Sequence, residues 1–212
     1  MRNRSLRAKM LLYLCSIVSL AFIFTISFVT MNARELTKRQ ALREAQEIAN
    51  RYSSVVKSEI ETALDAARTL ANAFEGIKAS GEVLPSRPIF DAMLKQVLEK
   101  NTNFMGVWSV WEPNALDGQD AMFINQWGYD ETGRYVPYWN RATGFSEVEP
   151  MANYRNPDKN DFYATPKTTG KEMVFDPQVY SISGSNVLMT RVVTPIFSQE
   201  QVIGVAGVDV ML

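Results

Sequence analysis

The chain has 212 residues and carries 22 Lys and Arg against 23 Asp and Glu, which gives a formal net charge of -1. Because there is no positive surplus, we expect no nucleic-acid partner. The chain has no His and only one Cys, Cys15, which excludes Ser-His-Asp triads, His-ligated zinc, thiolate clusters and internal disulfides. We therefore expect no metal and no cofactor.

An uncharged apolar run, residues 10–31, follows a basic leader, residues 1–9. As a helix the run can cross the ~30 Å hydrocarbon core of a bilayer. Charges after the run are mixed, so the positive-inside rule keeps the leader in the cytoplasm and places residues 32–212 in the periplasm or outside the cell. A cleaved signal peptide is the alternative, but residues 28–33 fit an A-x-A-like cleavage site poorly. We expect an uncleaved anchor in the inner membrane.

Residues 32–77 predict one long helix, because they contain no Pro and a single Gly, Gly76. Small or apolar residues recur at steps of three or four, at Ala41, Ala45, Ile48, Tyr52, Val56, Ile60, Leu64, Ala67, Ala71 and Phe74. A stripe of this length faces a neighbour, which is the chain's own domain, a second protomer, or both. We expect a homodimer through this helix, although so much Ala makes the stripe weaker than a Leu zipper.

After a break with Gly and Pro, residues 87–100 predict a second helix with Ser86 as its N-cap. The periodicity then becomes that of strands, which are predicted at residues 104–111, 121–127, 134–140, 172–180, 187–197 and 202–212. Tight polar turns between them indicate antiparallel neighbours. Residues 140–171 do not alternate, so we expect an irregular lid. The predicted fold class is α+β, with the long helix behind an antiparallel sheet and the lid over its other side.

The parts in this order resemble the double Cache (dCache) sensor domain of bacterial methyl-accepting chemotaxis proteins. The motifs that carry the resemblance are GVWSVWEPNALDGQD, GRYVPYWNR, DFYATPKTTGK, FDPQVY and TPIFSQEQVIGVAGVDV. The resemblance implies an extracytoplasmic sensor domain, residues 32–212, whose PAS-like membrane-distal module, about residues 86–212, holds a ligand between sheet and lid. It also implies a second module, a second transmembrane helix and cytoplasmic HAMP and signalling parts. Since none of these follows Leu212, we expect an N-terminal fragment.

In the amino-acid-binding branch of this family, an Arg-x-Trp-Tyr stretch holds the ligand carboxylate and a later Asp holds its amino group. The resemblance aligns that stretch with residues 160–163, where Asn160 replaces the Arg, Phe162 replaces the Trp and Tyr163 matches. Asp176 corresponds to the later Asp. Without the Arg, a ligand carboxylate loses its bidentate partner. The expected ligand is therefore a small molecule of one of four classes: an amino acid, an amine, a purine or an organic acid.

Strand 134–140 has two faces, and the sequence leaves open which one meets the ligand. One face offers Tyr138 with Asn140, and the other offers Trp139 with Arg141. The candidate ligand-binding residues are Trp108, Tyr138, Trp139, Asn140, Arg141, Tyr154, Asp161, Phe162, Tyr163 and Asp176.

The expected function is a membrane-anchored small-ligand sensor domain of a chemotaxis receptor, without enzymatic activity. The alternative is the sensor domain of a histidine kinase or a diguanylate cyclase, which can carry the same module. A surface-anchored hydrolase using Glu112, Asp161 and Asp176 is the weakest alternative, because the chain has no His and no carboxylate pair close in sequence. The acidic stretch 112–120 does not have EF-hand spacing, so we expect a structural turn there.

Overall fold

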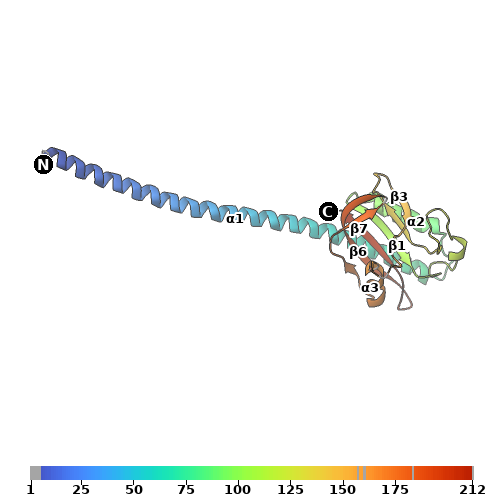
Figure 1. Cartoon of the computed structure of the whole chain (residues 1–212). Coiled ribbons are helices and arrows are strands. Elements are labelled where there is room, and N and C mark those ends of the chain that lie inside the picture. The colour runs from blue at the N-terminus through green and yellow to red at the C-terminus, as the bar shows by residue number, and fades with distance from the viewer. Residues whose placement is uncertain (1–5, 157, 160, 183, 212) are drawn as a thin grey trace. The chain divides into compact units, whose positions relative to one another are not determined.

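A computed structural model describes residues 6–156, 158–159, 161–182 and 184–211. The elements are α1 (Leu6–Ala79), α2 (Arg87–Lys100), β1 (Phe104–Trp111), a 3-10 turn (Asp120–Met122), β2 (Pro137–Asn140), β3 (Glu147–Pro150), α3 (Asp161–Thr169), β4 (Met173–Val174), β5 (Gln178–Ile182), β6 (Ser185–Ser198) and β7 (Gln201–Met211) (Figure 1). The chain divides into two compact units, Met1–Val55 and Val56–Leu212.

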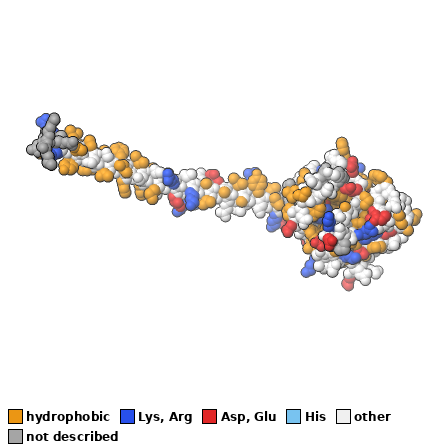
Figure 2. All heavy atoms as spheres, in the orientation of Figure 1, with side chains coloured by type: hydrophobic (Ala, Val, Ile, Leu, Met, Phe, Trp, Pro, Cys, Tyr) orange, Lys and Arg blue, Asp and Glu red, His pale blue; other side chains and the backbone are white. Residues whose placement is uncertain are grey.

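The described part of the first unit is α-helical throughout and belongs to α1. Neither Pro nor Gly interrupts α1 before Gly76, so its backbone hydrogen bonds continue without a break. Its hydropathy reaches a mean of 2.3 over 18 residues, and by length and composition it is long and apolar enough to cross a membrane. Apolar side chains surround the helix in this segment and are exposed (Figure 2). The exposed large apolar residues between Met10 and Met31 belong to the predicted anchor, residues 10–31.

The second unit is built on an antiparallel sheet with the strand order β3-β2-β1-β7-β6-β4, and β5 pairs with β6 as well (Figure 1). Its longest hairpin joins β6 to β7 through Gln199 and Glu200, whose φ angles are 48° and 64°. Two consecutive residues with positive φ match the right-handed twist of the flanking strands. The turn places Ser198 opposite Gln201, and a register shift between Ile196 and Phe197 then places Arg191 opposite Asp209.

One face of the sheet packs against the end of α1 and against α2. Ala67, Ala71 and Phe74 of the predicted stripe are buried there, together with Leu94 and Leu98 of α2. At this end of the helix, the neighbour that the stripe faces is therefore the chain's own domain. We call the opposite face of the sheet the lid face. It carries a second core cluster, which includes Trp108 and Tyr138 of the sheet, Phe162 and Tyr163 of α3 and Ile182 of β5.

Three predicted strands differ from the structure. The strand predicted at residues 134–140 is shorter, since β2 begins at Pro137. Residues 121–127 do not form a strand but a turn, because the Asp120 carboxylate accepts hydrogen bonds from Arg87 and from the backbone N–H of Asn114 and holds a 3-10 turn in place. Residues 172–180 form two strands, β4 and β5, instead of one. The break lies at Asp176 and Pro177, since proline has no N–H to continue the ladder.

The lid of residues 140–171 is more regular than predicted. It contains β3, which pairs with β2, and the nine-residue α3. The sequence hides α3 because Pro166 lies inside it, where proline costs a helix hydrogen bond. The second helix agrees with its predicted bounds, although Ser86 makes no side-chain capping bond. The acidic stretch 112–120 is a structural turn, as expected, whose Asp117 and Asp120 pair with Arg87.

A candidate ligand-binding face on the sheet

The centre of the lid face is a buried carboxylate with four hydrogen bonds. Asp209 accepts from Nε and Nη2 of Arg191, both at 2.8 Å, from Trp108 Nε1 at 3.0 Å and from the Tyr138 hydroxyl at 3.0 Å. Asp209 is 0% exposed and Arg191 4%. Removing two charges from water is unfavourable unless they are paired and fully hydrogen-bonded, and these bonds satisfy both carboxylate oxygens.

Strand register and two glycines bring these groups together. Trp108 on β1 lies opposite Tyr138 on β2, while the other neighbour of β1 is β7, which carries Asp209. A Cβ on Gly207 would lie 2.2 Å from the Trp108 ring, and one on Gly106 would lie 2.4 Å from the Tyr138 ring. Glycine is therefore needed at both positions so that each ring can lie flat across the neighbouring strand and reach Asp209.

The Arg191 guanidinium is surrounded by aromatic rings. Its central carbon lies 5.1 Å from the Trp108 ring centre, 4.4 Å from Phe162 and 4.8 Å from Tyr180. Burial alone would lower the pKa of Arg191, but the charge and hydrogen bonds of the Asp209 carboxylate have the larger combined effect. The pKa of Arg191 is therefore raised. Burial, with the negative charge of Asp209, raises the pKa of Tyr138 well above its usual value, so Tyr138 stays a hydrogen-bond donor. Cation–π contacts of this kind strengthen when they are shielded from water.

Helix α3 is attached to the end of β1 by polar contacts. The Tyr163 hydroxyl donates to Glu112 and accepts from Arg134 Nη2 at 3.0 Å. Lys167, one turn further along α3, pairs with Glu112 at 2.9 Å. On the same helix, the Phe162 ring stands edge-on to Trp108, with the ring centres 5.4 Å apart. The lid helix is thus joined to the sheet by the aromatic contact of Phe162 and by the polar contacts of Tyr163 and Lys167.

Tyr154 closes the side of this face next to the loop that precedes β2. Its hydroxyl donates to Asp130 at 2.6 Å, and the Arg134 guanidinium lies 4.8 Å from its ring centre. Burial and the hydrogen bond to Asp130 raise the pKa of Tyr154 to about 12, so the hydroxyl stays protonated at neutral pH.

The structure brings together five of the sequence-predicted site residues on the lid face: Trp108, Tyr138, Tyr154, Phe162 and Tyr163. Asn140 is buried at the end of the same strand and donates to Glu149 at 3.1 Å. Tyr138 therefore faces the lid, while Trp139 packs against the cluster on the helix side of the sheet. Which of the two faces meets a ligand stays a prediction.

The other predicted site residues lie elsewhere. Trp139 faces the helices and donates to Asp91 at 3.4 Å, and Arg141 donates to the backbone carbonyls of Leu98 and Asn101 at the end of α2. Trp139 and Arg141 therefore do not belong to the lid-face cluster. Two acids are exposed: Asp161 at the first turn of α3 and Asp176 between β4 and β5. Asn160, aligned with the family's Arg, lies outside the described residues.

Sequence reasoning missed four residues of this face: Arg134, Tyr180, Arg191 and Asp209. A signal for two of them is present, because Arg191 and Asp209 are single charges inside otherwise apolar predicted strands. Lys, Arg, Asp and Glu are almost never fully buried unless they are paired, so two such charges in adjacent strands indicate a pair.

Comparisons with known proteins show the family of this chain. The model of the family described as methyl-accepting chemotaxis protein-like, first PDC sensor domain, matches residues 72–212. The methyl-accepting chemotaxis protein TlpQ of Pseudomonas aeruginosa is 34% identical over 131 residues, which are 56% of this chain and 18% of that protein.

Two solved structures share the fold. The extracellular domain mmHK1S-Z2, described as that of a histidine kinase, is 34% identical with a TM-score of 0.69, over 81% of this chain and 60% of that one. Methyl-accepting chemotaxis protein X is 26% identical with a TM-score of 0.64, over 77% and 59%. The chain spans less than two thirds of the length of each of these relatives. The expected resemblance to chemoreceptor sensor domains is confirmed.

Proposed function

Given that the chain belongs to the methyl-accepting chemotaxis protein-like family of first PDC sensor domains, we propose that its second unit binds a small organic ligand on the lid face. The observation that carries the proposal is the Arg191–Asp209 pair within its aromatic surroundings. Apolar residues could fill the same space at equal or better stability, so a buried ion pair is poorly explained by stability alone. Its place between the sheet and the covering segment that carries α3 favours recognition.

Two groups on this face have hydrogen-bonding capacity left. Among the described residues, Nη1 of Arg191 and the hydroxyl of Tyr180 make no hydrogen bond, and the guanidinium lies over the Tyr180 ring. Both groups can donate, and the charge of Arg191 is already balanced by Asp209. The ligand we propose therefore carries an acceptor, such as a carboxylate or a ring carbonyl, next to a flat or apolar part that packs on Phe162. Amino acids, organic acids and purines carry such acceptors, and amines are the fourth class to be compared.

We propose that residues 10–31 anchor the domain in the inner membrane and that residues 32–212 lie in the periplasm or outside the cell, with the membrane-distal module at about residues 86–212. The apolar helix and the basic leader support this arrangement. The stripe residues Ile48 and Tyr52 are exposed in the single chain, which supports a homodimer through α1. Ligand binding would then shift the population of lid arrangements, and the receptor would pass this shift across the membrane to a chemotaxis output.

A second candidate is the sensor domain of a histidine kinase. The specific observation that favours it is the likeness to mmHK1S-Z2, whose identity and TM-score both exceed those of methyl-accepting chemotaxis protein X. Both candidates predict the same ligand-binding chemistry. A hydrolase has less support, because Glu112 is bound by Tyr163 and Lys167 while Asp161 and Asp176 are exposed on other segments.

The test is a thermal-shift screen of the full 212-residue chain in a mild detergent, with amino acids, amines, purines and organic acids as separate arms. All four Trp residues lie in the second unit, so Trp fluorescence reports the unfolding of that unit. A ligand at 100 times its dissociation constant should stabilise the fold by about 2.7 kcal/mol. The ligand-sensing proposal is wrong if no compound in any arm raises the melting temperature.

The site itself is tested with two variants. Tyr180→Phe keeps the ring and removes only the hydroxyl, so the variant should fold normally. Its affinity for the ligand found in the screen should be about tenfold lower than that of the wild type. Tyr52→Phe, the same change at an exposed position of α1, is the matched control and should leave the affinity unchanged. Equal affinity in Tyr180→Phe and the wild type would place the ligand elsewhere.

A further inference from the structure

The helix-facing side of the sheet carries a cavity of about 440 Å³ that is separate from the lid face. It lies between α2, the strands β2 and β3, and the loop that connects β1 to β2. The lining residues that matter are Asp91, Lys95, Phe123, Trp127, Tyr129 and Trp139. A volume of this size is typical of small-molecule sites, which are mostly apolar with a few polar groups. The cavity shares no residue with the Arg191–Asp209 cluster.

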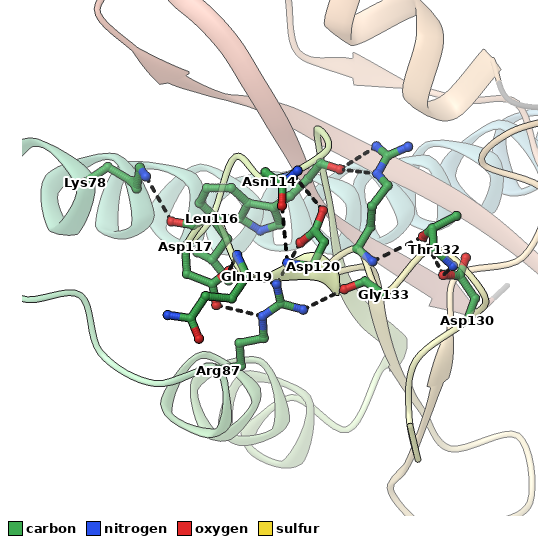
Figure 3. A network of polar contacts seen from close by, with 12 residues as sticks. Lys78, Arg87, Asn114, Leu116, Asp117, Gln119, Asp120, Asp130, Thr132 and Gly133 are labelled. Carbon is green, nitrogen blue, oxygen red and sulfur yellow. Dashed lines mark hydrogen bonds and ion pairs between the residues drawn. The ribbon is translucent and has the colours of Figure 1, made fainter. Parts of the chain in front are cut away.

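The loop wall of this cavity is held by a buried arginine. Arg87, the first residue of α2, donates to both carboxylate oxygens of Asp117 at 2.8 Å, to Asp120 at 2.7 Å and to the Gly133 carbonyl at 2.8 Å (Figure 3). Only 1% of Arg87 is exposed. Charge-assisted, bidentate bonds are among the strongest in proteins, so the loop is tied to α2 at several points. The wall is thus preformed.

Arg87 also supports the aromatic floor. Its guanidinium lies 4.0 Å from the ring centre of Phe123 and 5.4 Å from that of Tyr129, and the two rings are 4.9 Å apart. Because one cation already contacts these rings, a cationic ligand on their other side would gain less from them and would be repelled by Arg87. A neutral ring avoids this repulsion and still gains the stacking contact.

One carboxylate oxygen in the cavity is available to a ligand. Asp91 Oδ1 accepts from the Tyr135 hydroxyl at 3.0 Å and from Trp139 Nε1 at 3.4 Å, which fixes the side chain. Among the described residues, Oδ2 has no hydrogen-bond partner. Lys95, one turn along α2, places its ammonium 5.4 Å from the Trp139 ring centre and adds a donor at the rim. The Lys95 ammonium also pairs with Glu99 at 3.7 Å. The cavity therefore offers one fixed acceptor, Asp91, and one donor of opposite charge at its rim.

We propose that this cavity binds a flat, uncharged aromatic heterocycle that donates an N–H to Asp91 and stacks against the aromatic lining, which comprises Phe123, Trp127, Tyr129 and Trp139. The opposite charges of Asp91 and Lys95 leave the lining without net charge, which favours a neutral ligand with a donor and an acceptor. Trp127 is 84% exposed although it is a large aromatic residue, and a stacked ligand would cover it. The site lies on the opposite face of the sheet from the proposed sensor site and does not depend on it.

The probe is benzimidazole, which is flat and has one N–H donor and one ring-nitrogen acceptor. Binding to the full chain in detergent is measured at neutral pH by saturation-transfer NMR, with the bare micelles subtracted. We expect 1-methylbenzimidazole, which lacks the N–H, to bind at least tenfold more weakly, because the bond to a charged acceptor is lost. Equal binding of the two compounds would overturn the role of Asp91.

Two variants locate the probe. Trp127→Ala removes an exposed ring, so it should lower the affinity for benzimidazole at least tenfold and leave the melting temperature unchanged. Tyr180→Phe, on the lid face, should leave the affinity for benzimidazole unchanged. If benzimidazole does not bind, or binds Trp127→Ala as well as the wild type, the proposal is wrong. A second copy of the chain could also cover this surface, and sedimentation of the wild type and Trp127→Ala tests this. A wild-type dimer that becomes a monomer in Trp127→Ala would assign the surface to a second copy of the chain and overturn the ligand site.

Discussion

Arg191 and Asp209 are direct partners on the neighbouring strands β6 and β7, and they form a bidentate ion pair with both N–O distances at 2.8 Å. Trp108 and Tyr138, from the next two strands, donate to the same carboxylate. The pair therefore joins the four central strands of the sheet on the lid face. A pair with this burial makes the fold depend on both charges being present.

Asp209→Asn should lower the free energy of unfolding by about 3–5 kcal/mol, because it leaves the Arg191 guanidinium buried without a counter-charge. The measurement is urea unfolding of the full chain in detergent, followed by Trp fluorescence. Asp176→Asn changes an exposed acid in the same way and should alter stability by less than about 0.5 kcal/mol. A similar small change in both variants would mean that the ion pair adds little to the fold.

Gly207→Ala should destabilise the second unit by about 1–3 kcal/mol, the usual range for overpacking. The new Cβ would lie 2.2 Å from the Trp108 ring, so the ring must move and its bond to Asp209 is strained. Gly76→Ala is the control. Nothing lies within 4 Å of a Cβ at Gly76, and alanine is the better helix former, so this variant should be neutral or stabilising in the same urea experiment.

Tyr163→Phe should loosen α3, since it removes the hydroxyl that bonds both Glu112 and Arg134. Hydrogen bonds to charged groups contribute about 1.5–3 kcal/mol, so backbone amides of α3 should exchange at least about tenfold faster in hydrogen–deuterium exchange. Amides of β7 should be unaffected. Tyr52→Phe, at a side chain that is exposed, is the matched control, and equal exchange in α3 for both variants would contradict the attachment described above.

Asp117→Asn should change how stability depends on pH. Hydrogen bonds from Arg87 lower the pKa of Asp117 against the opposing effect of partial burial. The folded-state pKa is therefore below the unfolded one, so this contribution is full above the unfolded pKa, about 3.9, and is lost as the pH falls through the folded pKa. The variant should be less stable than the wild type at pH 7, and the difference should shrink on acidification.

Urea midpoints of wild type and Asp117→Asn at pH 7, 5 and 3 check this sign. The exposed Asp176→Asn is again the control, and its difference from the wild type should stay small at every pH. A gap between wild type and Asp117→Asn that widens as the pH falls would show that Arg87 does not stabilise the ionised form.

Much of the architecture follows from local patterns. Strand β1 and helix α2 agree with their predicted bounds, because hydrophobic periodicity and proline position act within a few residues. The turn at residues 120–122 and helix α3 were not predictable in this way. The turn depends on a hydrogen bond to Asp120 from Arg87, which lies more than thirty positions earlier in the chain. Helix α3 persists despite Pro166 because its aromatic side chains pack on the sheet.

The candidate site shows the same division. The sequence alone determined that aromatic and polar residues gather around strand 134–140 and the lid, and that an apolar helix with a basic leader precedes them. Only the tertiary structure decided that Tyr138 meets the lid while Trp139 meets the helices, and that Arg191 and Asp209 form the centre of the face. Alternation along a strand defines two faces but not their neighbours, which depend on the packing of segments far apart in the chain.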